Sequence, residues 1–168
     1  MAASVTARAN RLDLSRFAPV NRRRLSAPGL RTFMAIADLW GVNEEQRRLI
    51  LGYPSRSTYH RWCKQAREDG PFMLDVDVLT RVSAVLGIHR ALGVLFADEH
   101  DGVAWLRQPH EAPVFGGHPP LHLVVNGTQD GLMMVRRFLD AARGGLYMPP
   151  NAADADFAPY EDAEIIFQ

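Results

Sequence analysis

A short basic stretch between residues 55 and 66 carries side chains that can bind nucleic acid. If this stretch is helical, its apolar residues share one face, and its polar residues point the opposite way, toward solvent or DNA. Arginine binds guanine edges and phosphates, and hydroxyl, imidazole and ammonium groups supply further donors. We expect Arg61 to read a guanine and Arg56 to contact a phosphate. The predicted DNA contacts are Arg56, Ser57, Thr58, His60, Arg61 and Lys64.

Two helices must position these side chains. Asn43 and Gln46 form a capping-box pattern, which predicts a helix that ends at Gly52. A second helix follows after the hydroxyl cap of Ser55, and together the two helices match a helix-turn-helix. The Tyr53-Pro54 pair lengthens the turn by one residue, so the register of the base contacts stays open, and a helical hairpin with a solvated basic face is the alternative. The predicted inner face of the second helix consists of Tyr59, Trp62, Cys63 and Ala66.

Patterns for catalysis are weaker. The sequence contains no glycine-rich phosphate loop, no His-Glu-x-x-His and no Gly-x-Ser-x-Gly. His110, His118 and His122 could suggest a metal site, but two prolines separate the last two, which favours a loop and a helix start. Cys63 falls on the inner face of its helix, where a small core residue is the usual role. We therefore predict a protein that is not an enzyme and has no catalytic, cofactor-binding or metal-binding residues.

The rest of the chain also shows helical periodicity, which predicts an all-α fold. Pro28 and Gly29 precede the first periodic segment, so we expect the first helix to start there and to end at Gly41. Gly87 divides the most apolar stretch into two predicted helices. In addition to the two helices described above, we predict helices over residues 30–40, 75–86, 89–96, 98–107, 121–125 and 128–142.

Charge divides the chain near residue 67. The 168 residues have a formal net charge of zero, yet the first 67 carry 13 basic and 4 acidic residues, and the remainder carries 6 basic and 15 acidic ones. Such a division predicts that the front half meets an anionic partner and that the back half meets a different one.

Composition also indicates the cellular compartment in which the protein is found. Residues 1–28 are rich in arginine and predict a mobile basic arm; a solvated linker without contacts and an organellar transit peptide are the alternatives. Cys63 is the single cysteine, which indicates a reducing compartment. No apolar run approaches the ~20 residues needed to cross a bilayer. We expect a cytoplasmic protein without membrane contact.

Several segments, in the expected order, resemble one known family. The family's helix-turn-helix resembles residues 38–42, 51–52 and 57–62, and its central helices resemble residues 79–83 and 86–92. Its tryptophan and Gly-Gly-x-x-Pro-Leu signature resembles residues 105–109 and 115–121. Its closing helix resembles residues 131–132 and 135–145. On these segments the chain resembles the Xre/MbcA/ParS antitoxins of bacterial type II toxin-antitoxin systems. The likeness covers residues 29–145.

The resemblance implies an all-α homodimer that binds operator DNA, represses its own operon and inhibits a toxin with a RES domain. Such toxins degrade NAD or transfer ADP-ribose from it, whereas the antitoxin itself binds no NAD. The C-terminal domain would cover the entrance to the toxin's active site, in a heterotetramer or a larger complex. The acidic back half could complement a cleft built for an anionic dinucleotide. A plain helix-turn-helix regulator without a toxin is the alternative.

The predicted domain organisation has four parts: a basic arm over residues 1–28, a DNA-binding and dimerisation region over 29–97, a toxin-binding domain over 98–145 and an acidic tail over 146–168. Two features depart from the family: His110 stands where asparagine is common, and the tail extends beyond the usual end. We hypothesise that this tail also binds the toxin, the alternative being a disordered end. By analogy, Arg136, Arg137, Asp140 and Arg143 lie near the toxin-facing surface, and the tail would add Phe157, Tyr160 and Phe167.

Overall fold

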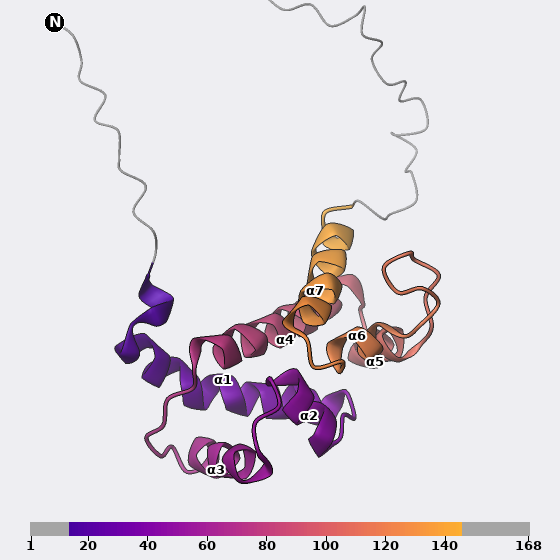
Figure 1. Cartoon of the computed structure of the whole chain (residues 1–168). Helices are drawn as coiled ribbons and strands as arrows, with labels where there is room; N and C mark the ends of the chain where they lie inside the picture. Colours follow the sequence, from indigo (N-terminus) through magenta and orange to yellow (C-terminus); the bar gives the residue numbers. More distant parts are fainter. Residues whose placement is uncertain (1–13, 146–168) are drawn as a thin grey trace, which may run out of the picture.

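The computed structural model of this chain describes residues 14–145, which form helices and no strand (Figure 1). The predicted all-α fold is therefore confirmed. After a short 3-10 turn at Ser15–Phe17, the helices are α1 (Pro19–Leu39), α2 (Glu44–Ile50), α3 (Arg56–Arg67), α4 (Val76–Leu95), α5 (Glu99–Arg107), α6 (Pro120–Val124) and α7 (Gln129–Arg143).

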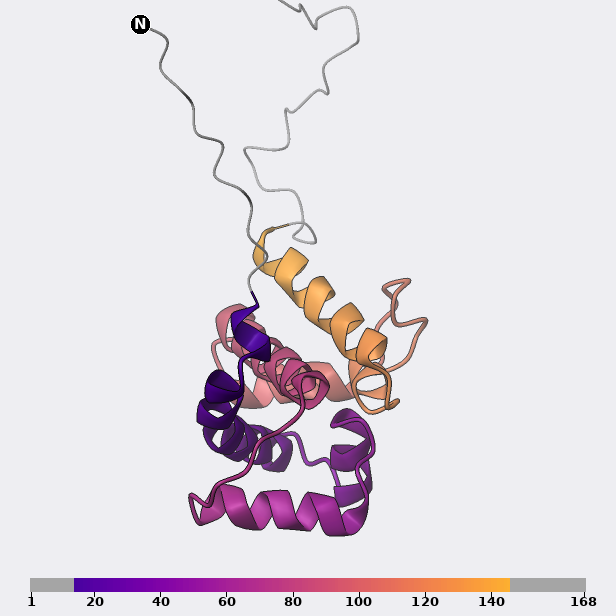
Figure 2. The ribbon, with the colours of Figure 1, turned by 60° about the vertical axis from the view of Figure 1, so that its left-hand side comes forward.

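Helix α4 is the centre of the packing. It contacts α1 on one side and α7 on the other, while α3 packs on α1 and α6 packs on α7. Both ribbon views place α3 at one end of the molecule and α7 at the opposite end (Figures 1 and 2). The largest fully buried side chains come from α1, α2, α4 and the C-terminal helices, so a single core connects the two ends.

Side-chain caps begin four of the helices. Asn43 and Gln46 form the predicted capping box, each bonding the other's backbone N–H at 2.9 Å. The hydroxyl of Ser55 accepts from the N–H of Thr58, Asp98 accepts from His100, and Thr128 accepts from Gly131. Because these bonds connect residues two or three apart, the sequence alone located these helix starts correctly.

The predicted start of the first helix is wrong. Helix α1 begins at Pro19, about ten residues before the expected start, and continues through Pro28. Tertiary contacts stabilise this extension: the Arg22 guanidinium donates two hydrogen bonds to the Leu74 carbonyl, and the buried Ser26 hydroxyl accepts from the Leu74 N–H. The second half of the predicted arm is therefore a structural element, because these long-range bonds offset the hydrogen bond that Pro28 cannot make.

The predicted division at Gly87 is also wrong, since α4 is one helix of 20 residues. A Cβ built on Gly87 would lie 2.0 Å from the guanidinium of Arg136, whereas one built on Gly93 would meet nothing within 4 Å. Gly87 therefore serves close packing of α7 on α4 and not a break in the helix.

Helix α4 is long and apolar enough to span a membrane by length and composition alone. Its buried residues include Val82, Val85 and Ile88, and it contacts α1, α5 and α7. These are the contacts of a core helix of a helical bundle.

Candidate functional site

The turn between α2 and α3 is held by Arg48, which is 7% exposed. Its Nε donates to the Pro54 carbonyl at 2.8 Å, its Nη1 pairs with Glu45 at 3.0 Å, and its guanidinium lies 4.5 Å from the centre of the Tyr53 ring. Gly52 and Tyr53 both have positive φ, of 89° and 61°. The extra turn residue is thus a left-handed tyrosine that Arg48 stabilises by stacking.

The outer face of α3 presents the predicted DNA-binding side chains. Arg56, Ser57, His60, Arg61 and Lys64 are all exposed on this face. Thr58 is half-buried, and its backbone N–H and hydroxyl both bond the Ser55 cap. We therefore assign Thr58 to the start of the helix, as we do the Ser57 hydroxyl, which lies 3.1 Å from the Ser55 hydroxyl.

The inner face of α3 packs on the core as the periodicity predicted. Tyr59, Cys63 and Ala66 are buried and Trp62 is half-buried. Burial raises the pKa of the Tyr59 hydroxyl to about 12 and also raises the pKa of the Cys63 thiol. Cys63 is therefore a protonated core residue, which is the opposite of what an activated nucleophile requires.

One carboxylate lies beside the outer face of α3. Glu44, in the first turn of α2, is 3.7 Å from Arg56 and 3.4 Å from the ring of His60. Arg61 and Lys64 make no ion pair with any described residue. The cations most available to a polyanion are therefore Arg61 and Lys64, in the middle of α3.

At the other end of the molecule, aromatic side chains connect α5 and α7. The Trp105 ring stacks on Phe138 at 6.0 Å and meets His110 at 4.8 Å, and Phe115 packs edge-on against Phe138 at 4.8 Å. The His110 ring also bonds the Trp105 carbonyl at 2.8 Å. This cluster fixes the loop over residues 108–119 onto α7.

The residues expected near a toxin-facing surface differ in their availability. The Arg136 guanidinium bonds the Ser83 carbonyl and Asp140 in addition to lying over Gly87, and Arg143 is 3.6 Å from Asp140. Arg137 is exposed and makes no ion pair with a described residue. The structure thus brings three of the four into one ion-pair network on the surface of α7, and Arg137 has no ion pair with a described residue, while Phe157, Tyr160 and Phe167 lie outside the described residues.

Two further arginines, which the sequence analysis did not single out, connect the two ends. Arg81 is mostly buried and donates through Nη1 to the Ile50 carbonyl at the end of α2 and to the Gly127 carbonyl before α7. Arg107 of α5 donates to the Trp40 carbonyl at the end of α1. No sequence motif marks these residues, because their acceptors are backbone carbonyls far away along the chain.

The three histidines that could suggest a metal site lie in the loop before α6 and in α6 itself. His118 and His122 stack with their ring centres 5.5 Å apart, while His110 bonds a carbonyl as described. Among residues 14–145, no three His, Cys, Asp or Glu side chains group in a way that could hold a metal ion.

Family comparisons cover both ends of this molecule. Residues 19–91 match the antitoxin Xre-like helix-turn-helix domain, and residues 91–145 match the antitoxin Xre/MbcA/ParS C-terminal toxin-binding domain. A curated relative, the "Uncharacterized protein y4oB" of Sinorhizobium fredii (strain NBRC 101917 / NGR234), is 34% identical over 116 residues, which is 69% of this chain and 84% of the relative. The chain belongs to the Xre/MbcA/ParS antitoxin family.

Family membership gives each end of the molecule a general role. In this antitoxin, α2 and α3 fall in the helix-turn-helix domain and α5 to α7 fall in the toxin-binding domain. The first match begins at residue 19, as α1 does, which agrees with the extended helix. The two matches meet within α4, so this helix belongs to both domains; the boundary at residue 97 stays a prediction.

Proposed function

We propose that this antitoxin inhibits a RES-domain toxin by covering its active-site entrance and represses its own operon through α3. The observation that carries the proposal is the placement of the two candidate surfaces at opposite ends of one continuous hydrophobic core (Figure 2). Because the surfaces do not overlap, DNA and a toxin could be bound at the same time.

On the DNA side, the proposal rests on the outer face of α3. It presents Arg56, Arg61 and Lys64 and carries no acidic residue between residues 56 and 67. Arg61 would read a base edge and Arg56 would contact a phosphate, after exchanging Glu44 for the DNA backbone. Binding should weaken steeply with salt, because phosphate contacts release counterions.

On the toxin side, the proposal rests on the outer face of α7. A shallow hollow there is lined by Val114, Met134, Arg137, Phe138 and Ala141. An exposed arginine beside methionine and aromatic side chains is a composition typical of protein interfaces. Arg137 would therefore be the principal toxin contact of α7, with Asp140 and Arg143 at its edge.

Dimerisation, which the family resemblance implies, has a suitable surface between α1 and α4. An apolar groove there is lined mainly by Leu25, Pro28, Leu79, Val82 and Leu86. Phe17 and Val20, which precede Leu25 in the chain, are 46% and 71% exposed. We propose that a second copy places these two apolar side chains in the groove, so that the same patch serves both protomers. A Leu25→Glu variant should then elute as a monomer in size-exclusion chromatography with light scattering, whereas an Arg90→Glu variant should not.

Copurification with the neighbouring gene product tests the proposed function. We expect a stable complex, in a heterotetramer or larger, in which the partner's consumption of NAD is suppressed. Arg137→Ala should weaken this inhibition and leave operator binding unchanged. A protein that binds its operator but captures no partner would instead be a plain helix-turn-helix regulator. A bacterial cytoplasmic location belongs to the same proposal.

A further inference from the structure

Four arginines lie on α1, and the fold holds only two of them. Arg22 and Arg31 donate to backbone carbonyls outside α1. Arg23 and Arg24 are exposed, and neither makes a hydrogen bond or an ion pair with a described residue. The fold thus accounts for the first two arginines and leaves Arg23 and Arg24 available to a partner.

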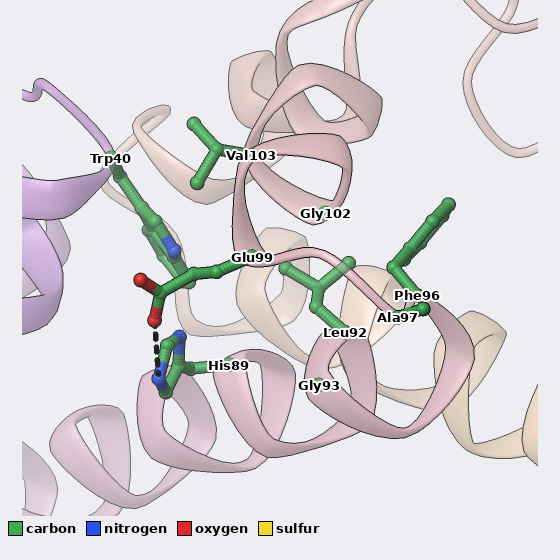
Figure 3. Close-up of a pocket in the computed structure, with 9 residues that line it drawn as sticks. All are labelled: Trp40, His89, Leu92, Gly93, Phe96, Ala97, Glu99, Gly102 and Val103. Carbon is green, nitrogen blue, oxygen red and sulfur yellow. Dashed lines mark ion pairs between the residues drawn. The ribbon is translucent and has the colours of Figure 1, made fainter.

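Helix α1 is anchored at both ends. Near its start, the guanidinium of Arg22 and the hydroxyl of Ser26 both bond the backbone of Leu74. Directly after its last residue, Trp40 is 1% exposed and lines a pocket together with side chains of α4 and α5 (Figure 3). The two free arginines therefore project from a helix whose position relative to the core is fixed.

The free pair lies beyond the C-terminal end of α3. The guanidinium of Arg31 marks the contact between the two helices, because it bonds the Ala66 carbonyl in the last turn of α3. Arg24 precedes Arg31 by two helical turns on the same side of α1, which is about 10.5 Å along the helix axis. Arg23 lines a hollow with residues 69–73, the segment that follows α3. Figure 1 shows the first turns of α1 extending past this end of α3.

The charges around the pair favour an anionic partner. Helix α1 has no acidic residue before Asp38, and its first turn contains none, so the positive end of the helix dipole adds to the two guanidinium charges. After α3, Asp69 pairs with Arg31, whereas Glu68 is exposed and makes no ion pair with a described residue. Because Glu68 follows Lys64 by one turn, it ends the basic outer face of α3. The free pair is therefore a second basic patch, separate from the cations of α3.

DNA phosphates are the anions that suit this patch. The helix-turn-helix match begins at residue 19, so both arginines belong to the DNA-binding domain. A recognition helix occupies a major groove about 12 Å wide, with a sugar-phosphate backbone along each side. A surface beyond the end of such a helix meets a backbone, and the guanidinium fork binds phosphate oxygens in pairs.

We propose that Arg23 and Arg24 form a second DNA contact, which binds backbone phosphates beside the site that α3 reads. This inference rests on the proposed DNA binding by α3 and extends it. The second contact reads no sequence and contributes affinity and salt dependence. The early start of α1 then serves DNA binding, because it places the two arginines beyond the end of α3.

Substitution of the pair tests the proposal in the full-length chain. Arg23→Gln/Arg24→Gln should weaken binding to a duplex from its own promoter by about tenfold or more at 0.15 M salt. The slope of log Kd against log salt should fall by about 1.8, because each phosphate contact contributes about 0.9. The midpoint of thermal unfolding should not change, since neither side chain contacts the rest of the fold. An unchanged salt slope in this variant would overturn the proposal.

A matched pair of single variants controls for net charge. Arg24→Gln and Arg90→Gln each remove one exposed arginine, the first from the proposed contact and the second from α4. Arg24→Gln should lower the salt slope by about 0.9, whereas Arg90→Gln should leave it nearly unchanged. Equal changes in the two variants would show that only the total charge matters, and the proposal would be wrong.

Duplex length locates the contact. Removal of about 5 base pairs, half a helical turn, from each flank of the footprinted operator should weaken binding of the unaltered chain. The double variant should bind the long and the short duplex equally well, because it no longer reaches the flanks. Equal losses in both proteins would contradict the proposed position of the arginines.

Arg61→Ala separates this proposal from the function on which it rests. If Arg61→Ala weakens binding to the same duplex and the double variant does not, α3 reads DNA and the second contact is wrong. If neither substitution weakens binding, the proposed role of α3 fails together with the second contact. If the double variant keeps its DNA affinity but loses partner capture or changes its mass in light scattering, the two arginines bind a protein instead.

Discussion

The outer face of α3 and the helices α4 to α7 of this antitoxin use arginine in different ways. On the outer face of α3, Arg61 has no partner among the described residues and faces solvent. In α4 to α7, Arg81, Arg107 and Arg136 donate to backbone carbonyls of other elements, as Arg22 and Arg48 do in the front half. The arginines of both halves thus connect elements of the fold, and the outer face of α3 differs by presenting a cation that no such contact holds.

This difference does not alter the net charge of the back half, because an ion pair neutralises its acidic partner as well as its basic one. Arg81 pairs with Asp77, and Arg136 and Arg143 pair with Asp140. Arg90 and Arg137 are exposed and make no ion pair with a described residue. Helix α7 carries three arginines against Asp130 and Asp140, so the acidic excess of the described back half lies outside this helix.

Removal of Arg81, which bonds backbone carbonyls of two other segments, should have the largest effect on stability. Arg81→Ala leaves the carbonyls of Ile50 and Gly127 and the carboxylate of Asp77 without their donor. We expect the free energy of unfolding in urea to fall by about 2–4 kcal/mol. Arg90→Ala, on the exposed side of the same helix, should change it by less than about 0.5 kcal/mol. Equal effects would show that Arg81 is no more structural than a surface residue.

Alkaline titration tests how firmly α3 is anchored. Burial raises the pKa of Tyr59 to about 12 from an ordinary value near 10. Because the unfolded chain loses this proton first, Tyr59 should contribute its full stabilisation below pH 10 and lose it as the pH rises through 12, by up to about 2 kcal/mol. Urea unfolding from pH 9 to pH 11.5 measures this loss. Tyr59→Phe should lack this part of the pH dependence; the same slope in both proteins would contradict the assignment.

A free arginine should matter for binding and not for folding. Arg61→Ala should weaken operator binding by about 1–3 kcal/mol in a titration at fixed salt, with toxin inhibition and the unfolding midpoint unchanged. Arg90→Ala again serves as the control, with little change in either affinity. Parallel loss of DNA binding and toxin inhibition would instead make Arg61 a structural residue, and the contrast between the two regions would fail.

The two glycines of α4 separate close packing from helix propensity. Gly87→Ala places a methyl group where the Arg136 guanidinium lies, so this flexible side chain must move and give up its bond to the Ser83 carbonyl, and we expect a smaller gain in stability than at Gly93 or none. Gly93→Ala meets open space and should stabilise the fold by about 0.5–1 kcal/mol. Thermal unfolding of both variants provides the comparison. Equal stabilisation by both substitutions would mean that the contact of Arg136 with Gly87 contributes nothing.

The smallest expected effect is at Glu44, the carboxylate beside the DNA-facing cations. Glu44→Gln should raise operator affinity by a few-fold at most, because an exposed ion pair contributes less than about 1 kcal/mol. Glu111→Gln removes an exposed negative charge from the other domain and should leave the affinity nearly unchanged. A loss of affinity in Glu44→Gln would indicate that Glu44 positions Arg56 for DNA.

Local patterns in the sequence predicted much of this molecule correctly. The capping box at Asn43, the caps at Ser55, Asp98 and Thr128, and the inner face of α3 all follow from bonds and periodicities within one or two helical turns. The family motifs also follow from residue order, so the antitoxin family could be inferred before any packing was known. The individual DNA and toxin contacts stay predictions.

Long-range contacts decided the rest. Arg22 holds a carbonyl 52 residues away, so α1 continues through Pro28 where local rules predict an interruption. The guanidinium of Arg136, from another helix, lies over Gly87, and Arg81 bonds carbonyls 31 and 46 residues away. The sequence by itself determined the side-chain caps, the family and the exposed basic face, because these depend on neighbours in the chain. Which arginines are free to bind a partner was decided by the tertiary structure, because only packing places a distant carbonyl within reach.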